Sequence, residues 1–489
     1  MIFVKKNSLS SITINNKIMK QFLGLILGLT LLTGCLTPGG GFPTPAVTST
    51  KAPEATPRPI NTPTPGMTPT LTPVWLVPDQ KLAGVTVTLW HPWTGDTAVQ
   101  LEKLVLDFNR TNEKGITVQA VAMGSAGAVA EQIPAALTTG MLPDVVVAPM
   151  ADLLTWRSQG AALVDLNSYL NDAEWGIPSE QLAEIPPHIW DQEAMDGQRL
   201  GLPAQRTTQV LFYNQTWARE LGFKAPPTTP AAFKEQSCAA AVALNNDRWA
   251  DNNGMGGWIW DADAETIWTW LVAFGANPLP SSIDHAYRFD STESAAAFSF
   301  LKSMIDEGCA WKSRYPVPYE QFAGRQTLMF SGDLTDIAVQ QRVQTLKKST
   351  DTWLVIPFPS PAGQPVAVVG GPTYAIFQTA PAEQLAAWAF VRWLVEPERQ
   401  ALLAQSAGAY PLSDTATEFM SAYADALPQW AATLAWLDWA QPAPGIASWS
   451  SVRHILEDAA WQVIQPGIAP DQIPAVLQEL DAMIDQYAH

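Results

Sequence analysis

The chain has 489 residues, a net charge of −18 at neutral pH and a mean hydropathy of +0.01. Such an acidic chain lacks the basic surface that nucleic-acid binding requires, which excludes a nucleic-acid partner. Once an N-terminal signal and a proline-rich segment are set aside, about 410 residues remain, too many for one hydrophobic core, so we expect at least two folded domains.

The first 35 residues have the pattern of a secretion signal that ends at a cysteine. Lysines precede an uncharged apolar stretch, residues 22–32, which is shorter than the roughly 20 residues of a membrane-spanning helix. Such a stretch is typical of a cleavable signal peptide. The residues that close it, Leu32-Thr33-Gly34-Cys35, resemble the lipoprotein box of bacteria. The resemblance implies that residues 1–34 are a lipoprotein signal peptide and that Cys35 carries the lipid.

Removal of residues 1–34, with their four lysines, takes the net charge from −18 to −22. A body with this charge is repelled by anionic headgroups, so we expect the lipid at Cys35 to make the membrane contact. Residues 35–80 contain eleven prolines and ten threonines, which predict a semi-rigid extended linker. We therefore expect a lipid-anchored protein outside the cytoplasm, at the cell surface or in the periplasm, translated from Met1 or from Met19.

The folded part begins with alternating strands and helices. Residues 85–90 are β-branched and apolar and predict a strand. Apolar residues then recur at helical spacing over 101–108, and a second strand and helix are predicted at 116–121 and 128–138. Residues 145–148 are entirely apolar, as a central parallel strand should be. This order predicts a parallel α/β sheet.

The rest of the chain continues the alternation and becomes mostly helical toward its end. Apolar and aromatic runs predict further strands at residues 209–213, 328–330, 353–356 and 366–369. Long helices are predicted at residues 383–394 and 475–487. Cys238 and Cys309 could form a disulfide outside the cytoplasm, or could be two separate buried thiols.

Motifs of enzymes are missing from the sequence. The five histidines are scattered singly, without zinc-ligand spacing, and there is no nucleophile elbow or phosphate-binding loop. Asp261, Asp263 and Glu265 form an acidic cluster, which we interpret as a solvated loop because a glycosidase needs two carboxylates that face each other across a bond. We therefore expect no catalytic residues, no metal and no cofactor.

Tryptophan is frequent, with 21 residues against nine tyrosines. Four tryptophans crowd into residues 258–270 close to three glycines, and Trp90 and Trp93 flank the end of the first predicted strand. Aromatic faces suit sugars, because a pyranose presents a face of C–H groups while polar neighbours satisfy its hydroxyls. The competing interpretation is that these rings fill the core, since large aromatics are on average well buried.

Several stretches, taken in order, resemble the extracellular solute-binding proteins of ABC importers, family 1, in the maltose-binding and glycerol-3-phosphate-binding group. The resemblance covers about residues 83–470, and its specificity comes from the order and spacing of the stretches. They are Val87–His91 with Gly95, Leu142–Val146, Pro203 with Leu211–Asn214, Phe330–Asp333, Gly370–Pro372, Ala387–Phe390, Pro397–Gln400 and Gly408–Pro411.

This resemblance implies an α/β fold of the class II periplasmic-binding-protein type, with two lobes, a ligand cleft between them and a helix-rich C-terminal part. Lobe 1 would comprise residues 81–205 and 333–385, and lobe 2 residues 206–332 and 386–489. The chain would cross between the lobes near residues 203–210, 327–335 and 380–395. The implied protein is a monomer that closes on its ligand and docks on the permease subunits of an ABC transporter.

The resemblance, the strand ends and the tryptophans together predict the ligand contacts. The predicted contacts are Trp90, Trp93, Asp96, Met150, Asp152, Arg206, Thr207, Thr208, Tyr213, Trp258, Trp260, Asp261, Ser331, Asp333, Gly370, Gly371 and Tyr410. Trp258 and Trp260 would supply a stacking face, while Asp96 and Asp261 favour a neutral polyhydroxylated ligand. Arg206 could equally form an ion pair between the lobes. Asp333 departs from the apolar or aromatic residue that relatives often carry.

Three functions follow from these features. The first is a lipoprotein that binds a mono- or oligosaccharide for an ABC importer. The second is the same fold with glycerol-3-phosphate or a related phosphorylated polyol as ligand, for which Arg206 is the obvious charge. The third is a cell-surface glycosidase or adhesion lipoprotein, which ranks last because no pair of facing carboxylates can be placed.

Overall fold

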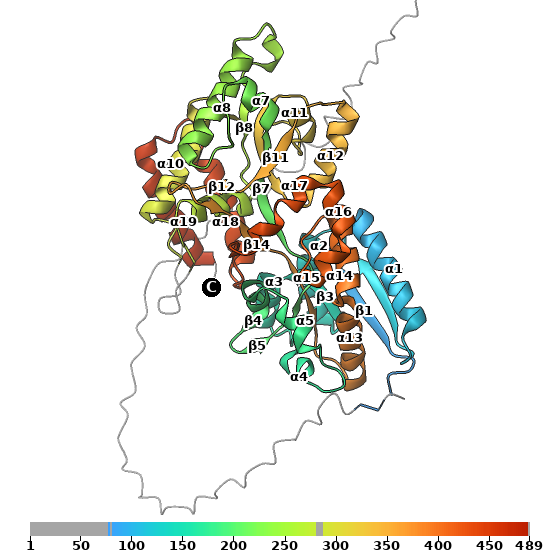
Figure 1. Ribbon diagram of the computed structural model, residues 1–489. Helices are drawn as coiled ribbons and strands as arrows, with labels where there is room; N and C mark the ends of the chain where they lie inside the picture. Colours follow the sequence, from blue (N-terminus) through green and yellow to red (C-terminus); the bar gives the residue numbers. More distant parts are fainter. Residues whose placement is uncertain (1–76, 79–80, 280–286, 488–489) are drawn as a thin grey trace, which may run out of the picture. The chain divides into compact units, whose positions relative to one another are not determined.

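A computed structural model describes residues 77–78, 81–279 and 287–487 (Figure 1). The expected signal peptide, Cys35 and nearly all of the expected linker lie outside the described residues. Within the described part of the chain, no helix combines the length and the apolar character that crossing a bilayer would require.

The first sheet has five strands in the order β2-β1-β3-β15-β6. The strands are β1 (Thr86–His91), β2 (Thr117–Ala122), β3 (Val145–Pro149), β6 (Leu202–Pro203) and β15 (Pro372–Ile376). β1 is parallel to both β2 and β3, while β15 is antiparallel to β3 and β6. The predicted order of strands and helices is therefore confirmed at the start of the chain.

Helices cover both faces of the first sheet. One face buries α1 (Gly95–Thr111) and α13 (Pro381–Leu394), where Phe108 meets Phe390 edge to face at 5.0 Å. α1 turns Leu101, Leu104, Val105 and Phe108 inward, as its periodicity predicts. The other face packs against α2 (Ala126–Thr139) and α3 (Met150–Ser158), and α2 keeps its internal proline.

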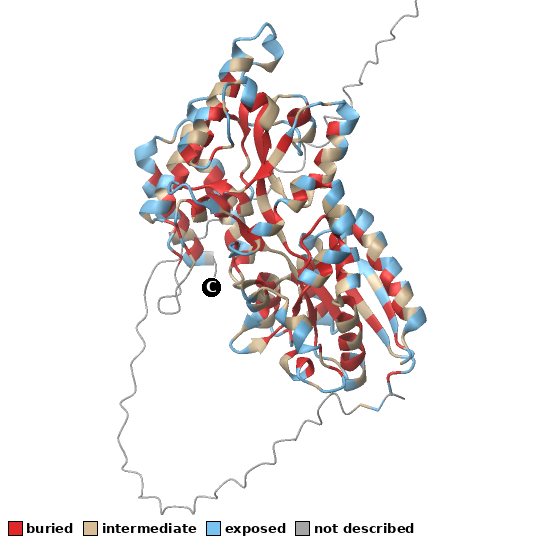
Figure 2. Cartoon of the chain, in the orientation of Figure 1, coloured by how far each residue is buried: buried red, intermediate tan, exposed pale blue. Residues whose placement is uncertain are grey.

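The second sheet has the order β16-β14-β7-β10-β8-β9, and β11 also pairs with β7. The strands are β7 (Thr207–Asn214), β8 (Gly256–Ile259), β9 (Ala310–Trp311), β10 (Thr327–Asp333), β11 (Trp353–Ile356), β14 (Val368–Gly370) and β16 (Gln441–Pro442). β8 is parallel to β9 and β10, while β7 is antiparallel to β10, β11 and β14. The inner strands of both sheets are largely buried (Figure 2).

Two layers of helices enclose the second sheet. The helices on one face are α8 (Pro230–Asn245), α9 (Ala264–Ala273), α10 (Thr292–Asp306), α18 (Trp449–Val463) and α19 (Ile473–Tyr487). The other face contacts α11 (Tyr319–Ala323), α12 (Asp336–Lys347), α14 (Pro397–Ala407), α15 (Asp414–Phe419) and α17 (Pro428–Ala431). β7 serves both layers because its successive side chains alternate, Leu211 toward the first and Phe212 toward the second.

A disulfide joins Cys238 in α8 to Cys309 beside β9, across a sequence separation of 71 residues. This pairing is one of the two arrangements that the sequence left open. Gly257 permits the close approach, because a Cβ atom there would lie 1.9 Å from the carbonyl oxygen of Cys309.

Strand pairing changes the expected lobe boundaries in two places. β11 and β14 belong to the second sheet, so residues 353–370 do not join lobe 1 as expected. α13 packs against β1 and β15, so residues 386–394 do not join lobe 2. The first change arises because residues 329–333 of β10 pair with residues 209–213 of β7, so that the chain stays in the second sheet at this point. We retain two lobes as a proposal, with these boundaries revised.

The expected crossing near 327–335 is likewise wrong, because Thr327–Asp333 stays in one sheet. The chain instead passes between the sheets at residues 204–206, between β6 and β7, and at Gly371, between β14 and β15. The remaining connection runs from α13 through α14 to Tyr410, later in the chain than expected, where Tyr410 forms a β-bridge with Arg206.

Candidate ligand-binding site

An open hollow of about 310 Å³ lies at the carboxyl end of β8. Trp260, Asp261, Ala262 and Asp263 line it as the chain leaves β8 for α9, and Glu457 and Trp461 of α18 complete the wall. Its volume is at the lower end of small-molecule sites, roughly 300–1,000 Å³. The carboxyl ends of parallel strands are the usual place for ligands in α/β proteins, and β8 is parallel to both of its neighbours.

Two indole rings form the aromatic part of the wall. The rings of Trp260 and Trp461 meet edge to face, with centroids 6.3 Å apart. Trp461 is 43% exposed, whereas Trp260 is only 5% exposed and its indole N–H has no hydrogen-bond partner among the described residues. This N–H is closed off from solvent, so Trp260 contributes ring surface to the wall of the hollow and no free donor.

In the loop between β8 and α9, neutral groups donate hydrogen bonds to the carboxylates of Asp261 and Asp263. Asp261 accepts hydrogen bonds from the hydroxyl of Thr266 at 2.7 Å and from the backbone N–H of Asp263 at 3.0 Å. Burial raises the pKa of Asp261 to about 6. Asp263 accepts from the N–H of Glu265 at 3.0 Å and caps α9. These bonds hold the loop in one conformation, so the carboxylate positions are preorganised.

α18 places a third carboxylate against the same loop. Glu457 accepts a hydrogen bond from the N–H of Ala264 at 3.4 Å, and its other oxygen lies 3.2 Å from Nδ1 of His454. Trp461 follows Glu457 by one helical turn, which puts both side chains on the same side of α18.

Arg453, also in α18, connects the surroundings of the hollow with the first sheet. Its Nη2 lies 3.3 Å from Oε2 of Glu265. Burial raises the pKa of Asp152 in α3 to about 6, and the charge of Arg453 opposes this rise. Burial also raises the pKa of Glu265, and the neighbouring Asp263 adds to that rise. α3 follows the first sheet directly, so this cluster links both sides of the molecule.

A hydrogen-bonded contact supports the same connection. α3 packs against α18, and the hydroxyl of Thr155 donates to the carbonyl of Ala447 at 2.8 Å. The hydroxyls of Thr155 and Ser450 lie 3.1 Å apart. Met150 lies at the start of α3, buried close to Gly445, and so belongs to this junction and not to the wall of the hollow.

Of the predicted ligand contacts, Trp260 and Asp261 line the hollow. Trp90 lies within β1, Trp93 and Asp96 follow this strand, and none of the three lines the hollow. Trp93 packs edge to face against Tyr374 at 6.2 Å, and Asp96 is exposed in the first turn of α1.

Arg206 is engaged by the protein itself. Its side chain is 0% exposed, pairs with Glu193 and donates to the carbonyl of Pro372 at 3.0 Å. Burial raises the pKa of Glu193, and the charge of Arg206 opposes the rise. The structure therefore contains an ion pair of Arg206, and the ligand contact of Arg206 stays a prediction.

Other predicted contacts near residues 204–206, where the chain passes between the sheets, also bind protein groups. Thr207 donates to Asp333 at 2.5 Å, and burial raises the pKa of Asp333 to about 6, with Asp336 adding to the rise. The hydroxyl of Tyr410 donates to the carbonyl of Thr433 at 3.2 Å. Three more predicted contacts, Thr208, Gly370 and Gly371, lie where chain segments pack closely.

Three predicted contacts are buried in or against the second sheet. Tyr213 is buried and donates to Oε1 of Gln236 at 2.9 Å. Trp258 is fully buried beneath Trp260, and its indole N–H donates to the hydroxyl of Ser331 at 3.2 Å. The predicted stacking role of Trp258 is wrong because its ring has no free face, and Ser331 is occupied as its acceptor.

Sequence reasoning missed Ala262, Asp263, Glu457 and Trp461 as lining residues. Asp263 was noted but interpreted as a solvated loop residue. Glu457 and Trp461 stand four residues apart on a helix, which is a usable signal of a shared face. Nothing local indicates that this face meets the end of β8, which lies about 200 residues earlier in the sequence.

A second concavity does not qualify as a solute site. It lies between the α5 (Ser179–Ala183) region and α14, and its volume of about 20 Å³ is room for little more than one water molecule.

Comparisons with known proteins agree with this architecture. A family model described as bacterial extracellular solute-binding protein matches residues 103–433. The search of curated proteins finds no match. Among solved structures, the cyclic alpha-maltosyl-1,6-maltose binding protein of Arthrobacter globiformis is 19% identical with a TM-score of 0.68, covering 82% of this chain and 99% of that chain.

Two further structures are similar to a comparable degree. The sugar-binding protein MalE of Xanthomonas citri is 22% identical with a TM-score of 0.68, covering 83% of this chain and 97% of that chain. UgpB of Mycobacterium tuberculosis, solved with glycerophosphocholine, is 17% identical with a TM-score of 0.67, covering 82% of this chain and 98% of that chain. The predicted fold is confirmed as that of class II periplasmic binding proteins, and the chain belongs to the family of bacterial extracellular solute-binding proteins.

Proposed function

We propose that the protein captures a carbohydrate outside the cytoplasm and delivers it to the permease of an ABC importer. The observation that carries the proposal is the hollow at the end of β8, with two indole rings and three carboxylates in its wall. An indole face packs on the C–H face of a pyranose, and carboxylates accept hydrogen bonds from hydroxyls. Its volume of about 310 Å³ suits one sugar ring or a short oligosaccharide.

A phosphorylated polyol fits this wall less well. A phosphate requires a cluster of donors, preferably arginine or lysine. None of the six residues that line the hollow is basic, the nearby Arg453 is paired with Glu265, and Lys312 over the Trp461 ring supplies one charge and not a cluster of donors. The likeness to the glycerophosphocholine complex keeps this alternative worth testing.

Binding without turnover is part of the proposal. Members of this family are transport components that bind a solute, so we expect no bond of the ligand to be broken. Incubation with chromogenic glycosides should release no product. Steady release would favour the glycosidase alternative instead.

The lipid anchor at Cys35 is a separate element of the proposal. It rests on the apolar stretch and the Leu-Thr-Gly-Cys sequence. Membrane fractionation of cells that express the full chain should recover the protein with membranes. The variant Cys35→Ala lacks the thiol that takes the lipid, so we expect less of the processed protein to be recovered with membranes. Equal recovery of the processed variant and the wild type with membranes would contradict the lipid anchor.

Calorimetry with a panel of mono- and oligosaccharides tests the central proposal. We expect Trp461→Ala to weaken binding by about tenfold, since a stacked aromatic contributes roughly 1 kcal/mol beyond its buried area. Trp439→Ala is the matched control, because Trp439 is 38% exposed and does not line the hollow. Failure of every sugar to bind, or equal losses in both variants, would contradict the assignment of this site.

A further inference from the structure

We infer that Thr266 of α9, which does not line the hollow, is the positioning residue that holds the carboxylate of Asp261 as an acceptor for hydroxyl groups of the solute. This inference rests on the proposed function and adds a residue to the machinery of the same hollow. The contacts that the two side chains make within the protein support it.

Asp261 lines the hollow, and each oxygen of its carboxylate accepts one hydrogen bond from the protein. Oδ2 accepts from the hydroxyl of Thr266 at 2.7 Å, and Oδ1 accepts from the backbone N–H of Asp263 at 3.0 Å. An ionised carboxylate offers about four lone-pair positions, so each oxygen keeps capacity for a further donor. The hydroxyl groups of a sugar are donors of this kind.

Thr266 is the donor that the core of the second sheet holds in place. Its side chain is 0% exposed and lies in the first turn of α9. The hydroxyl also lies 3.2 Å from Oε1 of Gln209 in β7. A hydroxyl has a single hydrogen, and a charged acceptor makes the stronger bond, so the hydrogen goes to Asp261 while that group is ionised. Gln209 becomes the acceptor when Asp261 takes up a proton.

The hydrogen bond from Thr266 also acts on the ionisation of Asp261. Burial raises the pKa of Asp261 to about 6, with the charges of Asp263 and Asp336 adding to the rise. The hydrogen bonds from the N–H of Asp263 and from Thr266 oppose the rise. A protonated carboxyl group accepts fewer hydrogen bonds. Loss of the Thr266 hydroxyl should therefore raise the pKa of Asp261 further and weaken its contact to a solute hydroxyl.

Other charged or titratable groups around the loop remain unchanged when Thr266 is substituted. They are Glu265 in α9, Arg453, His454 and Glu457 in α18, and Lys312 over the ring of Trp461. The pH dependence of the wild type alone combines their effects with that of Asp261. A difference between variants of Thr266 isolates the contribution of this one hydroxyl.

Calorimetry of the full chain over a pH series tests the inference, with glucose, maltose and maltotriose as probes. We expect the wild-type affinity for the most tightly bound of these sugars to fall about tenfold from about pH 8 to about pH 5, as Asp261 takes up a proton. In Thr266→Val the midpoint of this fall should move up by about one pH unit, because the carboxylate has lost a donor. Thr266→Ser keeps the hydroxyl and should restore the wild-type midpoint.

Thr269→Val is the matched control. Thr269 is equally buried in α9, and its hydroxyl donates to the carbonyl of Glu265 at 2.7 Å. Its substitution removes a buried hydroxyl from the same helix without altering a residue that lines the hollow. We expect Thr269→Val to keep the wild-type midpoint. An equal shift in this control, or no shift in Thr266→Val, overturns the inference.

A measurement without sugar separates the two proposals. Carbon NMR titration of the Asp261 carboxyl group, assigned through Asp261→Asn, reports the effect of Thr266 in the absence of a ligand. If no sugar binds the wild type, the proposed function fails, and an unchanged pKa of Asp261 in Thr266→Val overturns the inference as well. If sugars bind but Thr266→Val raises the pKa of Asp261 without moving the midpoint of binding, the proposed function stands and the inference alone fails.

Discussion

Arg206 is the residue through which the segments that join the two sheets meet. Its guanidinium pairs with Glu193, and Nη1 donates to the carbonyls of Gln205 at 2.8 Å and Pro372 at 3.0 Å. Its own carbonyl accepts from the N–H of Tyr410 at 2.8 Å. One buried residue therefore holds all three connections at fixed positions, and their relative movement must preserve or break these bonds.

We expect Arg206→Met to lower the free energy of unfolding by about 3–5 kcal/mol, because it leaves Glu193 buried and unpaired. The double variant Arg206→Met with Glu193→Leu should recover a large part of the loss, since both charges are then gone. Urea unfolding of the single and double variants measures the difference. Losses that simply add would show that the two side chains are not coupled.

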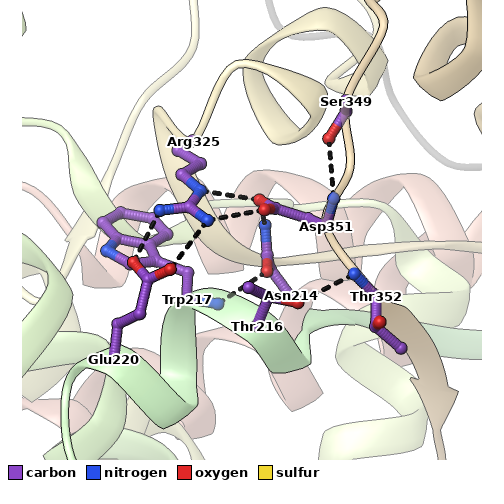
Figure 3. A network of polar contacts seen from close by, with 8 residues as sticks. All are labelled: Asn214, Thr216, Trp217, Glu220, Arg325, Ser349, Asp351 and Thr352. Carbon is purple, nitrogen blue, oxygen red and sulfur yellow. Dashed lines mark hydrogen bonds and ion pairs between the residues drawn. The ribbon is translucent and has the colours of Figure 1, made fainter.

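At the scale of elements, a polar network joins several segments at the end of β7 opposite Arg206. Arg325, which precedes β10, donates to both oxygens of Asp351 at 2.7 and 2.5 Å and to Glu220 of α7 (Gln215–Glu220) at 2.6 and 3.1 Å. Asn214, at the end of β7, donates to Asp351 at 2.7 Å and accepts from Trp217 (Figure 3). The network joins β7, α7, β10 and the segment before β11.

This network predicts a pH dependence of stability. Arg325, and to a lesser extent Asn214, hold the pKa of Asp351 below its usual value. A carboxyl group with a depressed folded-state pKa stabilises above its unfolded pKa, about 3.9, and that stability is lost as the pH falls through the folded-state value. Asp351→Asn should therefore be less stable than wild type near pH ~6, and the difference should shrink on acidification.

Urea unfolding at several pH values measures this effect. Glu220→Gln serves as the comparison, because Glu220 is more than half exposed and its pairing with Arg325 is screened by solvent. A difference between Asp351→Asn and wild type that stays constant down to about pH 2 would contradict the assigned role of Asp351.

For the whole molecule, the position of the hollow raises the question of how ligand binding there is coupled to a movement of the first sheet relative to the second. Four of the six wall residues follow β8, and the other two lie on α18, which packs against the second sheet. A ligand shifts a conformational balance only through contacts that differ between the two states. Asp152 of α3, which faces Arg453, is our candidate for such a contact from the first sheet.

Small-angle scattering should therefore show a smaller radius of gyration when a bound sugar is present at saturation. We expect Asp152→Asn to reduce this compaction. Binding of the sugar should still be measurable by calorimetry, because Asp152 is not one of the six residues that line the hollow. A sugar that does not bind is the control for solvent effects. Binding without any compaction in the wild type would show that the ligand is held by the second lobe alone.

The strands and helices that depend on local periodicity were predictable. Residues 101–108 place their apolar side chains on one face of α1, and the apolar run 145–148 became the buried strand β3. Both outcomes follow because each pattern states which side of an element must avoid water. The ordered resemblance to solute-binding proteins predicted the fold of about residues 83–470, and the family match and the shared fold confirm the fold class.

The amino-acid sequence alone thus predicts the elements with clear periodicity and the negative net charge, and the ordered resemblance predicts the fold class. Three features emerge only in the folded chain: β11 and β14 join the second sheet, Arg206 pairs with Glu193, and Glu457 and Trp461 face the end of β8. The reason is that these contacts join residues far apart in sequence. Periodicity tells which face of a helix is covered, whereas packing of the complete chain decides what covers it.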